Sequence, residues 1–390
     1  MKKTFLLLII LLVSCQRTIT IDSDLLVFDN KLNRLIDRLV PDRRDHIVDI
    51  YSVEQNDTLI LMGATDYIVL LDSVNNLTSQ YSKPVINQVR LLPDEAFKNK
   101  MGITRLSVAN LRAKPKHSAE LVTQTLMGTP LQIYETRNDF YLVKTPEGYY
   151  AWVDAAGITI LSNKDYQAWL HKRKVVVTAN ACTVLQKPEK NALPVSDAVI
   201  YDVFASLEVG DYYTKVRYPD GRTGYIATEN VLDIQYMNAD NTADDTPDDI
   251  IQAAQQFLGI PYLWGGTSSK ALDCSGFTKT VYAEFGYVLP RDASQQVKIG
   301  DKIELTDDFE YLEKGDLLFF GRIAEGKEKI THVAIYMGDG KIIHATGEVK
   351  IESLKKDDAL YNEARRKSLL QVRRIFKRYP KEWMKFYYLP

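Results

Sequence analysis

Three residues in the C-terminal third of the chain, Cys274, His332 and His344, could together perform nucleophilic catalysis. A thiolate is a strong nucleophile, an imidazole can remove the thiol proton, and a further polar group can orient that imidazole. Each residue alone is as easily explained by packing, because cysteine often behaves as a small buried apolar residue. Their combination, with glycines and aromatic residues around them, favours a cysteine-dependent acyl-transfer site.

The position of Cys274 depends on a helix that the flanking residues predict. Apolar residues recur every four positions from Phe277 to Phe285, and Gly286 is placed to end the helix. Asp273 is then the N-cap, so Cys274 falls in the first turn. Free backbone N–H groups and the helix dipole stabilise an anion there, and we expect them to lower the pKa of the thiol.

The two histidines lie in a predicted β-hairpin, because apolar residues alternate on both sides of the glycine-rich segment 338–340. If that segment is a three-residue loop, His332 lies opposite Thr346, and His344 is its diagonal neighbour on the same face. A two-residue turn at Asp339-Gly340 would place the two rings on opposite faces. The hairpin register therefore decides whether the histidines meet.

Several separate motifs follow one another in the last third of the chain. They are Pro261-Tyr262-Leu263-Trp264-Gly265-Gly266, Asp273-Cys274-Ser275-Gly276-Phe277, Leu289-Pro290-Arg291, Gly315-Asp316-Leu317, His332-Val333-Ala334-Ile335-Tyr336 and His344-Ala345. In this order they resemble the NlpC-type bacterial cell-wall cysteine peptidases, which have a papain-like core. The resemblance covers residues 246 to 390, a little over a third of the chain.

The resemblance implies a role for each matching residue. Cys274 would be the nucleophile, His332 the base and His344 the residue that orients it. Tyr262, together with the backbone N–H of Cys274, would stabilise the oxyanion, although this tyrosine could instead pack in its Pro/Gly-rich loop. No cofactor is implied, and the sequence has no metal-binding motif of the usual spacing.

Arg291-Asp292-Ala293-Ser294-Gln295-Gln296 looks like one subgroup of that family, the γ-D-glutamyl-L-diamino acid endopeptidases of the dipeptidyl-peptidase VI type. In that subgroup the acid at the position of Asp292 recognises the free amine of an N-terminal L-alanine. Asp273, Ser275 and Arg291 are further substrate-binding candidates. The alternative for Asp292 is a turn or cap residue beside Arg291.

Two segments in the middle of the chain repeat at a constant offset of 73 residues. Tyr141-Leu142-Val143-Lys144-Thr145-Pro146-Glu147-Gly148 is echoed by Thr214-Lys215-Val216-Arg217-Tyr218-Pro219-Asp220-Gly221. Short β-runs with Pro/Asp/Gly turns predict duplicated small barrels, at residues 101–162 and 170–236. They resemble bacterial SH3-like domains. The subgroup closes its pocket with a tyrosine from the first such domain, for which Tyr149 and Tyr150 are adjacent candidates and Tyr150 is favoured.

The N-terminus has the profile of an export signal. Met1-Lys2-Lys3 precedes an apolar run that is too short to span a bilayer, and Leu12-Val13-Ser14-Cys15 resembles a lipoprotein processing site. We expect residues 1–15 to be a lipoprotein signal ending at the lipid-bearing Cys15, which would anchor the chain to a bacterial membrane on its periplasmic or surface side. The alternative is a plain secretory signal in which Cys15 is incidental.

Length and composition fit a multidomain protein. The chain has 390 residues, of which 45% are apolar and 26% charged, and its formal charge of −2 argues against nucleic acid as a partner. Of the three cysteines, Cys182 has no evident partner, and we expect a buried, inert thiol there. Helix and strand patterns at 22–95 predict a small α/β module, residues 238–245 a linker, and Thr246-Pro247 the start of a helix.

The predicted fold is therefore α+β and multidomain: a small N-terminal α/β module, two SH3-like β-barrels and a papain-like core at 246–390. The predicted function is a monomeric cysteine peptidase that hydrolyses the γ-D-glutamyl-L-diamino acid bond of peptidoglycan stem peptides bearing a free N-terminal L-alanine. Two alternatives remain, namely an SH3-mediated binder or hydrolase of intact peptidoglycan, and an acyltransferase or amidase with the same Cys–His core.

Overall fold

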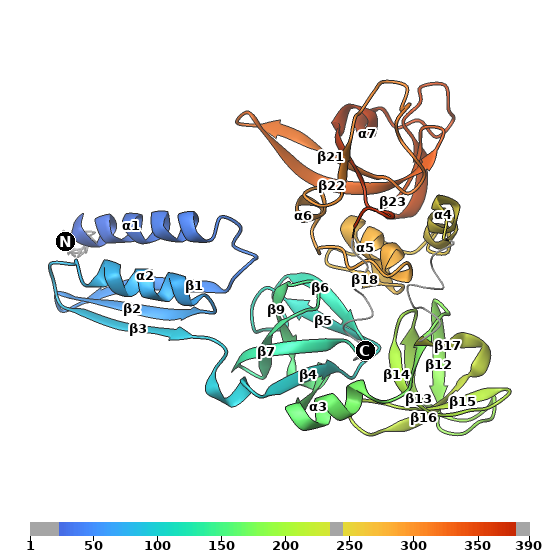
Figure 1. Ribbon diagram of the computed structural model, residues 1–390, viewed down its shortest axis with the longest axis horizontal. Helices are drawn as coiled ribbons and strands as arrows, with labels where there is room; N and C mark the ends of the chain where they lie inside the picture. The colour runs from blue at the N-terminus through green and yellow to red at the C-terminus, as the bar shows by residue number, and fades with distance from the viewer. Residues whose placement is uncertain (1–22, 235–244, 380–390) are drawn as a thin grey trace, which may run out of the picture. The chain divides into compact units, whose positions relative to one another are not determined.

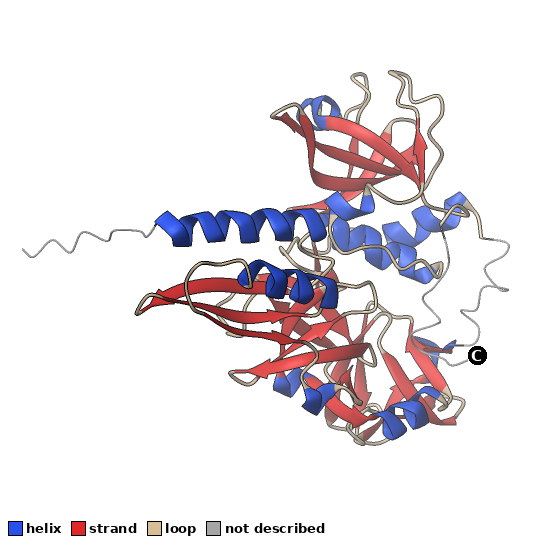
Figure 2. Cartoon of the chain, turned by 60° about the vertical axis from the view of Figure 1, so that its left-hand side comes forward, coloured by secondary structure: helices blue, strands red, loops and turns tan. Residues whose placement is uncertain are grey.

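The computed structural model describes residues 23–234 and 245–379, which divide into two compact units at Leu91/Leu92. The predicted lipid site Cys15 lies outside the described residues, as does nearly all of the predicted linker. Figure 1 shows the chain coloured from the N-terminus to the C-terminus, and Figure 2 shows its helices and strands. No helix among the described residues is both long and apolar enough to cross a membrane.

The first unit is a three-stranded sheet with two helices on one face (Figure 1). Its elements are α1 (Ser23–Leu39), β1 (Val48–Gln55), β2 (Thr58–Thr65), α2 (Ile68–Thr78) and β3 (Val85–Leu91). β1 and β2 pair antiparallel, and β2 and β3 pair parallel. Leu59 and Leu61 of the central strand are fully buried against both helices. Asn56 and Asp57, both with positive φ, form the two-residue turn between β1 and β2.

The second unit begins with two seven-stranded sheets that have the same strand order. The first contains β4 (Lys100–Thr104), β5 (Val108–Arg112), β6 (Leu121–Leu126), β7 (Pro130–Arg137), β8 (Phe140–Lys144), β9 (Tyr150–Asp154) and β10 (Ile158–Ser162). After α3 (Asn163–Leu170), the second contains β11 (Lys174–Val177), β12 (Ala181–Leu185), β13 (Pro194–Val199), β14 (Val203–Val209), β15 (Tyr213–Arg217), β16 (Thr223–Ala227) and β17 (Val231–Asp233).

The orders are β10-β4-β7-β8-β9-β5-β6 and β17-β11-β14-β15-β16-β12-β13, so that each strand has its equivalent seven strands later. Gly148 and Gly221, 73 residues apart, both have a φ of 91° in equivalent turns. The repeat in the sequence is therefore also a repeat in strand order. Each order runs between two edge strands, and closure into a barrel stays a prediction.

The C-terminal part combines helices with a six-stranded sheet. Its elements are α4 (Pro247–Gln255), β18 (Thr267–Ser268), β19 (Ala271–Leu272), α5 (Cys274–Glu284), α6 (Ala293–Gln296), β20 (Asp301–Ile303), β21 (Leu317–Ala324), β22 (Lys327–Gly338), β23 (Lys341–Thr346), β24 (Glu348–Ser353), α7 (Glu363–Ser368) and β25 (Leu369–Arg374). The sheet order is β20-β25-β21-β22-β23-β24. The main apolar core joins α4 and α5 to β22 and β23 through Ile250, Phe277, Val333 and Ile343. The multidomain α+β class is confirmed.

Candidate active site

Asp273 caps the helix that carries Cys274, as the sequence predicts. The Asp273 carboxylate accepts hydrogen bonds from the backbone N–H groups of Gly276 at 2.7 Å and Gly265 at 2.9 Å. α5 begins at Cys274, and Gly286 follows its end with a φ of 83°. The cap thus fixes both the helix start and the loop that precedes it.

Arg291 holds that cap from the other side. Its guanidinium donates to both Asp273 carboxylate oxygens and, at 2.9 Å, to the Ser275 hydroxyl. Arg291 is only 2% exposed, so this bidentate pair is almost fully buried. These three predicted substrate-binding residues are therefore bonded to one another, and Arg291 supports the groups on either side of Cys274.

The thiol of Cys274 does not ionise as easily as its helix position predicts. Burial, followed by the negative charge of Asp273, raises its pKa to about 11. The backbone N–H groups of Val333 and Ser275 oppose this shift by donating to the sulfur, and they do not overcome it. Our expectation of a lowered pKa was wrong, because the helix-dipole argument ignores the loss of solvent around a side chain that is 7% exposed.

The hairpin has the register predicted for the longer loop, with Ile335 opposite Ile343 and Tyr336 opposite Ile342, and it brings the two histidine rings together. The turn has two residues, Asp339 and Gly340, both with positive φ, and Gly338 pairs with Lys341. A β-bulge between Tyr336 and Gly338 absorbs one residue. The bulge restores the register of the longer loop, so the expectation that a two-residue turn separates the rings was wrong.

As a result, His332 Nε2 lies 2.7 Å from His344 Nδ1, and the rings are nearly perpendicular at 84°. Burial lowers the pKa of both imidazoles, that of His332 well below 6.5. Both rings are therefore neutral near pH 7. Because Val333 donates to the sulfur, Cys274 lies beside the strand residue that follows His332.

Glu352 continues this chain of polar groups and was missed in the sequence. Its Oε2 lies 3.2 Å from Nε2 of His344, which is fully buried, although that nitrogen is not aligned for a well-formed hydrogen bond. Asn362 donates to the same oxygen at 2.9 Å, and Lys350 pairs with Oε1 at 3.1 Å. The hydrogen bond with His344 is the first cause of a Glu352 pKa lowered to about 2. Residue alternation along β24 from the histidine hairpin could have pointed to it.

Cys274 opens onto a cleft of about 500 Å³ between the peptidase-like part and the first seven-stranded sheet. The cleft is lined by Glu120, Val122, Tyr149, Trp264, Asp273, Cys274, Ser275, Arg291, Asp292, Ala293, Ser294, Ile330 and Thr331. Glu120 and Trp264 did not emerge from the sequence. They are bonded to each other, because Trp264 Nε1 donates to a Glu120 carboxylate oxygen at 2.8 Å.

The tyrosine that lines the cleft is Tyr149, and the preference for Tyr150 is corrected. Tyr150 is the first residue of β9, and its ring packs edge-on against Tyr134 at 5.3 Å and under the Lys144 ammonium at 4.6 Å. Neighbouring side chains of an extended segment point to opposite sides, so only one of the pair can face Cys274.

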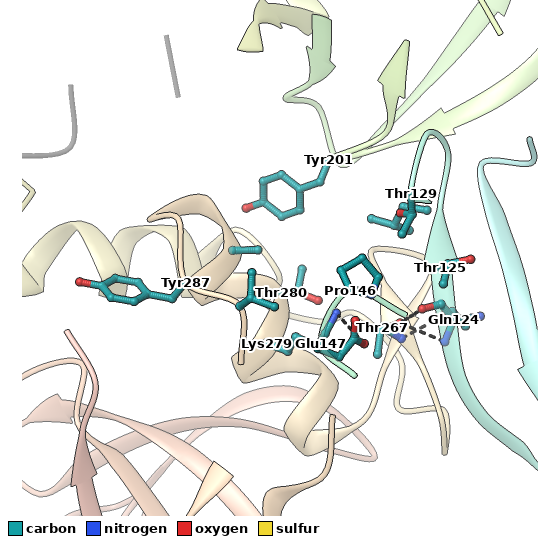
Figure 3. Close-up of a pocket in the computed structure, with 13 residues that line it drawn as sticks. Gln124, Thr125, Thr129, Pro146, Glu147, Tyr201, Thr267, Lys279, Thr280 and Tyr287 are labelled. Atoms are coloured by element: carbon teal, nitrogen blue, oxygen red, sulfur yellow. Dashed lines mark hydrogen bonds and ion pairs between the residues drawn. The ribbon is translucent and has the colours of Figure 1, made fainter. Parts of the chain in front are cut away.

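Hydrogen bonds between Gln124 on β6 and Thr267 on β18 hold the first sheet against the loop before Cys274. Three of them, at 3.0 to 3.2 Å, join the two residues in both directions. Figure 3 shows them at the edge of a second cavity, which Tyr201, in the turn between β13 and β14, and Lys279 of α5 also line. The wall of the cleft is thus a fixed part of the second unit.

Tyr262 and Asp292, two further predicted site residues, both lie near Cys274. Tyr262 is half-buried and close enough to Cys274 that burial, and then the thiolate charge, raise the pKa of its hydroxyl to about 12. Asp292 lines the cleft and also precedes α6, where its backbone carbonyl accepts hydrogen bonds from the backbone N–H groups of Gln295 and Gln296.

Cys182 is partly buried, and burial raises the pKa of its thiol to about 11. Among the described residues, no group of three or more His, Cys, Asp or Glu side chains could hold a metal ion.

Comparison with known proteins identifies the family. Residues 259–374 match the NlpC/P60 family and residues 107–159 a bacterial SH3 domain. The chain is 32% identical to the γ-D-glutamyl-L-lysine dipeptidyl-peptidase of Bacillus subtilis (65% of this chain, 81% of that protein) and 31% identical to dipeptidyl-peptidase 6 of Lysinibacillus sphaericus (66% and 92%).

A crystal structure of an NlpC/P60 family protein from Bacillus cereus superposes with a TM-score of 0.58 at 24% identity, over 70% of this chain and 99% of that one, which shows a shared fold. The sequence match extends well beyond the catalytic motifs and into the SH3 domain. The chain therefore belongs to the NlpC/P60 family of cysteine peptidases and carries a bacterial SH3 domain ahead of its catalytic domain.

Proposed function

We propose that this peptidase hydrolyses the bond between γ-D-glutamate and an L-diamino acid in released peptidoglycan peptides that begin with a free L-alanine. One observation carries the proposal: Cys274 shares its cleft with three carboxylates, Glu120, Asp273 and Asp292, of which Asp273 is paired with Arg291. A carboxylate next to a buried ammonium favours a free N-terminus and rejects an acylated one, which has lost its charge. The similar proteins whose names include γ-D-glutamyl-L-lysine dipeptidyl-peptidase support the same bond.

In the proposed reaction, Cys274 attacks the γ-carbonyl carbon of the glutamate while its proton passes to His332. Collapse of the tetrahedral intermediate breaks the C–N bond, and His332 returns the proton to the leaving amine of the diamino acid. Water then attacks the thioester with His332 again as base, which releases L-Ala-γ-D-Glu and restores the thiol. Because both partners begin neutral, the thiolate forms only as the proton is transferred.

Two donors are candidates for the oxyanion, namely the backbone N–H of Cys274 and the hydroxyl of Tyr262. A pKa of about 12 keeps this hydroxyl protonated near neutral pH, so it can donate a hydrogen bond there. Each such donor in well-studied hydrolases contributes about 3 to 4 kcal/mol of transition-state stabilisation.

Incubation with L-Ala-γ-D-Glu-L-Lys and with its N-acetylated form tests the substrate. We expect release of free lysine from the first peptide only, and no activity in a Cys274→Ala variant. Equal cleavage of both peptides would remove the requirement for a free amine. Cosedimentation of Cys274→Ala with purified sacculi, without cleavage of either peptide by the wild type, would favour the alternative of a wall-binding protein.

We also propose that Cys15 carries a lipid that anchors the protein to a bacterial membrane from the cell envelope. This part is supported by the sequence Leu12-Val13-Ser14-Cys15 after a short apolar run. Metabolic labelling with a fatty-acid analogue tests it: label in the wild type and none in Cys15→Ala is the expected result.

A further inference from the structure

The first unit contains a groove between its two helices that is lined by positive charge. Lys31, Arg34 and Arg38 of α1 line one side of a cavity of about 500 Å³. Ser73 and Asn76 of α2, and Gln80 just after that helix, line the other side. The three cations follow one another at intervals of three and four residues, so they form one stripe along the helix. We call this set the α1–α2 groove.

The cations of the α1–α2 groove have no partners within the described part of the chain, since Lys31, Arg34 and Arg38 make no hydrogen bond, ion pair or ring contact there. Other cations of the same unit form ion pairs. Arg43 Nη2 lies 2.7 Å from Asp37 Oδ1, and Lys83 Nζ lies 2.9 Å from Glu54 Oε1. Among the described residues of this unit, the cations without partners therefore gather in the α1–α2 groove.

This arrangement is not needed for folding. Like charges three or four residues apart on a helix destabilise it by a few tenths of a kcal/mol per pair. The apolar stripe of α1, which includes Phe28, Leu32 and Ile36, already fixes the helix against the sheet. A polyanionic ligand would turn this repulsion into a favourable binding free energy, because guanidinium groups bind phosphate oxygens with paired, charge-assisted hydrogen bonds.

Two observations favour a membrane as the source of that phosphate, namely exposed apolar residues on α1 and the short stretch of chain between α1 and Cys15. Leu26 and Val27, near the start of the helix, are 53% and 52% exposed, and Val27 lines the hollow that continues from Lys31 toward Asp24. A helix with a basic stripe and exposed apolar residues is typical of binding at a membrane interface. Ser23 follows Cys15 by eight residues, a reach of at most about 28 Å, so a lipid on Cys15 would keep the groove near a bilayer.

We propose that the α1–α2 groove binds the phosphate of anionic phospholipid headgroups. The location of this site at a membrane rests on the proposed lipid anchor, whereas the binding chemistry does not. Attraction of each cation to an anionic surface typically changes the affinity about fivefold, and the effect decreases with salt because it is electrostatic.

Vesicle sedimentation with the unlipidated chain from residue 16 tests the groove without the anchor. We expect binding to vesicles of equal parts phosphatidylglycerol and phosphatidylcholine, at least tenfold weaker binding to phosphatidylcholine alone, and loss of binding in 0.5 M NaCl. Arg34→Gln/Arg38→Gln should weaken binding ~10- to 30-fold. The matched control Arg43→Gln/Arg44→Gln removes the same charge from ion-paired positions and should bind within twofold of the wild type.

Three results would overturn the proposal: no binding to anionic vesicles, equal losses in the two double variants, or unchanged binding by Arg34→Gln/Arg38→Gln. Titration with inorganic phosphate separates the sources, because groove-dependent phosphate binding without vesicle binding would also reject the membrane. Unfolding temperature and hydrolysis of L-Ala-γ-D-Glu-L-Lys serve as folding controls. If the chain cleaves this peptide but does not bind vesicles, the membrane proposal fails and the proposed reaction stands. If the chain binds vesicles but does not cleave the peptide, the proposed reaction fails and the membrane proposal stands.

Discussion

His332 Nε2 and His344 Nδ1 lie 2.7 Å apart, and the acceptor beyond them determines where their protons are. A carboxylate can only accept, so Glu352 favours the proton of His344 on Nε2, which faces it at 3.2 Å. His344 Nδ1 then accepts from His332 Nε2–H. Nδ1 of His332 is then left without a proton, as the base of the proposed reaction must be.

Replacement of Glu352 by Gln should lower kcat about 10- to 100-fold with KM changed less than about twofold, because an amide can donate as well as accept and no longer specifies the tautomer. It should also move the acidic limb of the kcat/KM profile to lower pH, because Glu352 raises the pKa of His332. Steady-state kinetics from pH 4 to 8 would measure both effects. Glu348→Gln, an exposed change on the same strand, is the control. An unchanged kcat and profile in Glu352→Gln would reject a positioning role.

Alkylation of Cys274 by iodoacetamide should be slow at pH 7.5 and should rise steadily with pH beyond 9. A shift of the thiol pKa from 9.0 to about 11 leaves about a hundredfold less thiolate at neutral pH. Mass spectrometry of the chain from residue 16, in a Cys182→Ser background, would isolate the reaction at Cys274. A rate that levels off near pH 6 would instead show a preformed thiolate–imidazolium pair and would contradict the neutral starting state.

Asp292→Asn should reduce kcat/KM for L-Ala-γ-D-Glu-L-Lys about 10- to 100-fold, because it removes one of the three carboxylates that line the cleft. The already poor hydrolysis of the N-acetylated peptide should change little. The exposed Asp307→Asn is a charge-matched control. Equal losses for both peptides would indicate that Asp292 acts by shaping the start of α6 and not by recognising an amine.

Arg291→Met should destabilise the second unit by about 3 to 5 kcal/mol, because it leaves the Asp273 carboxylate buried without its bidentate partner. Chemical denaturation would measure the free energy of unfolding. Arg378→Met, which breaks an exposed pair with Asp301 at 3.7 Å, should cost less than about 1 kcal/mol. Similar losses in the two variants would mean that the buried pair contributes no more than a surface one.

His332 and His344 should contribute a loss of stability as the pH decreases from about 6.5. Burial lowers the pKa of His332 and His344 in the folded state, so below 6.5 the unfolded chain binds protons that the folded chain does not. Glu352 adds a second loss between its ordinary value of 4.5 and its folded value of about 2, again because the unfolded state takes up the proton first. Unfolding temperatures from pH 8 to 4 would test this. His344→Gln should flatten the upper part of the curve, and an unaltered curve would contradict the assignment.

Local patterns predicted the elements that carry the site. Four-residue apolar spacing located α5, the aspartate before it located Cys274 in the first turn, and alternation located the strands of both histidines. These features depend on residues within about ten positions of one another. The 73-residue repeat was visible for the same reason, since equivalent turns need the same glycines.

Properties that depend on distant residues could not be read in this way. A bulge at Met337 sets the pairing register of the strands that carry the two histidines. The direction of neighbouring side chains determines that Tyr149, and not Tyr150, lines the cleft. Glu120 and Glu352 reach the site only through sheet pairing and packing between domains.

The sequence by itself determined that this protein has a thiol at a helix start, two histidines on adjacent strands and a duplicated β-unit before them. Only the tertiary structure decided the protonation of the thiol and the acidity of the cleft. The physical reason is that hydrogen-bonded turns and periodic burial are local, whereas the removal of water around a charge depends on every segment that packs against it.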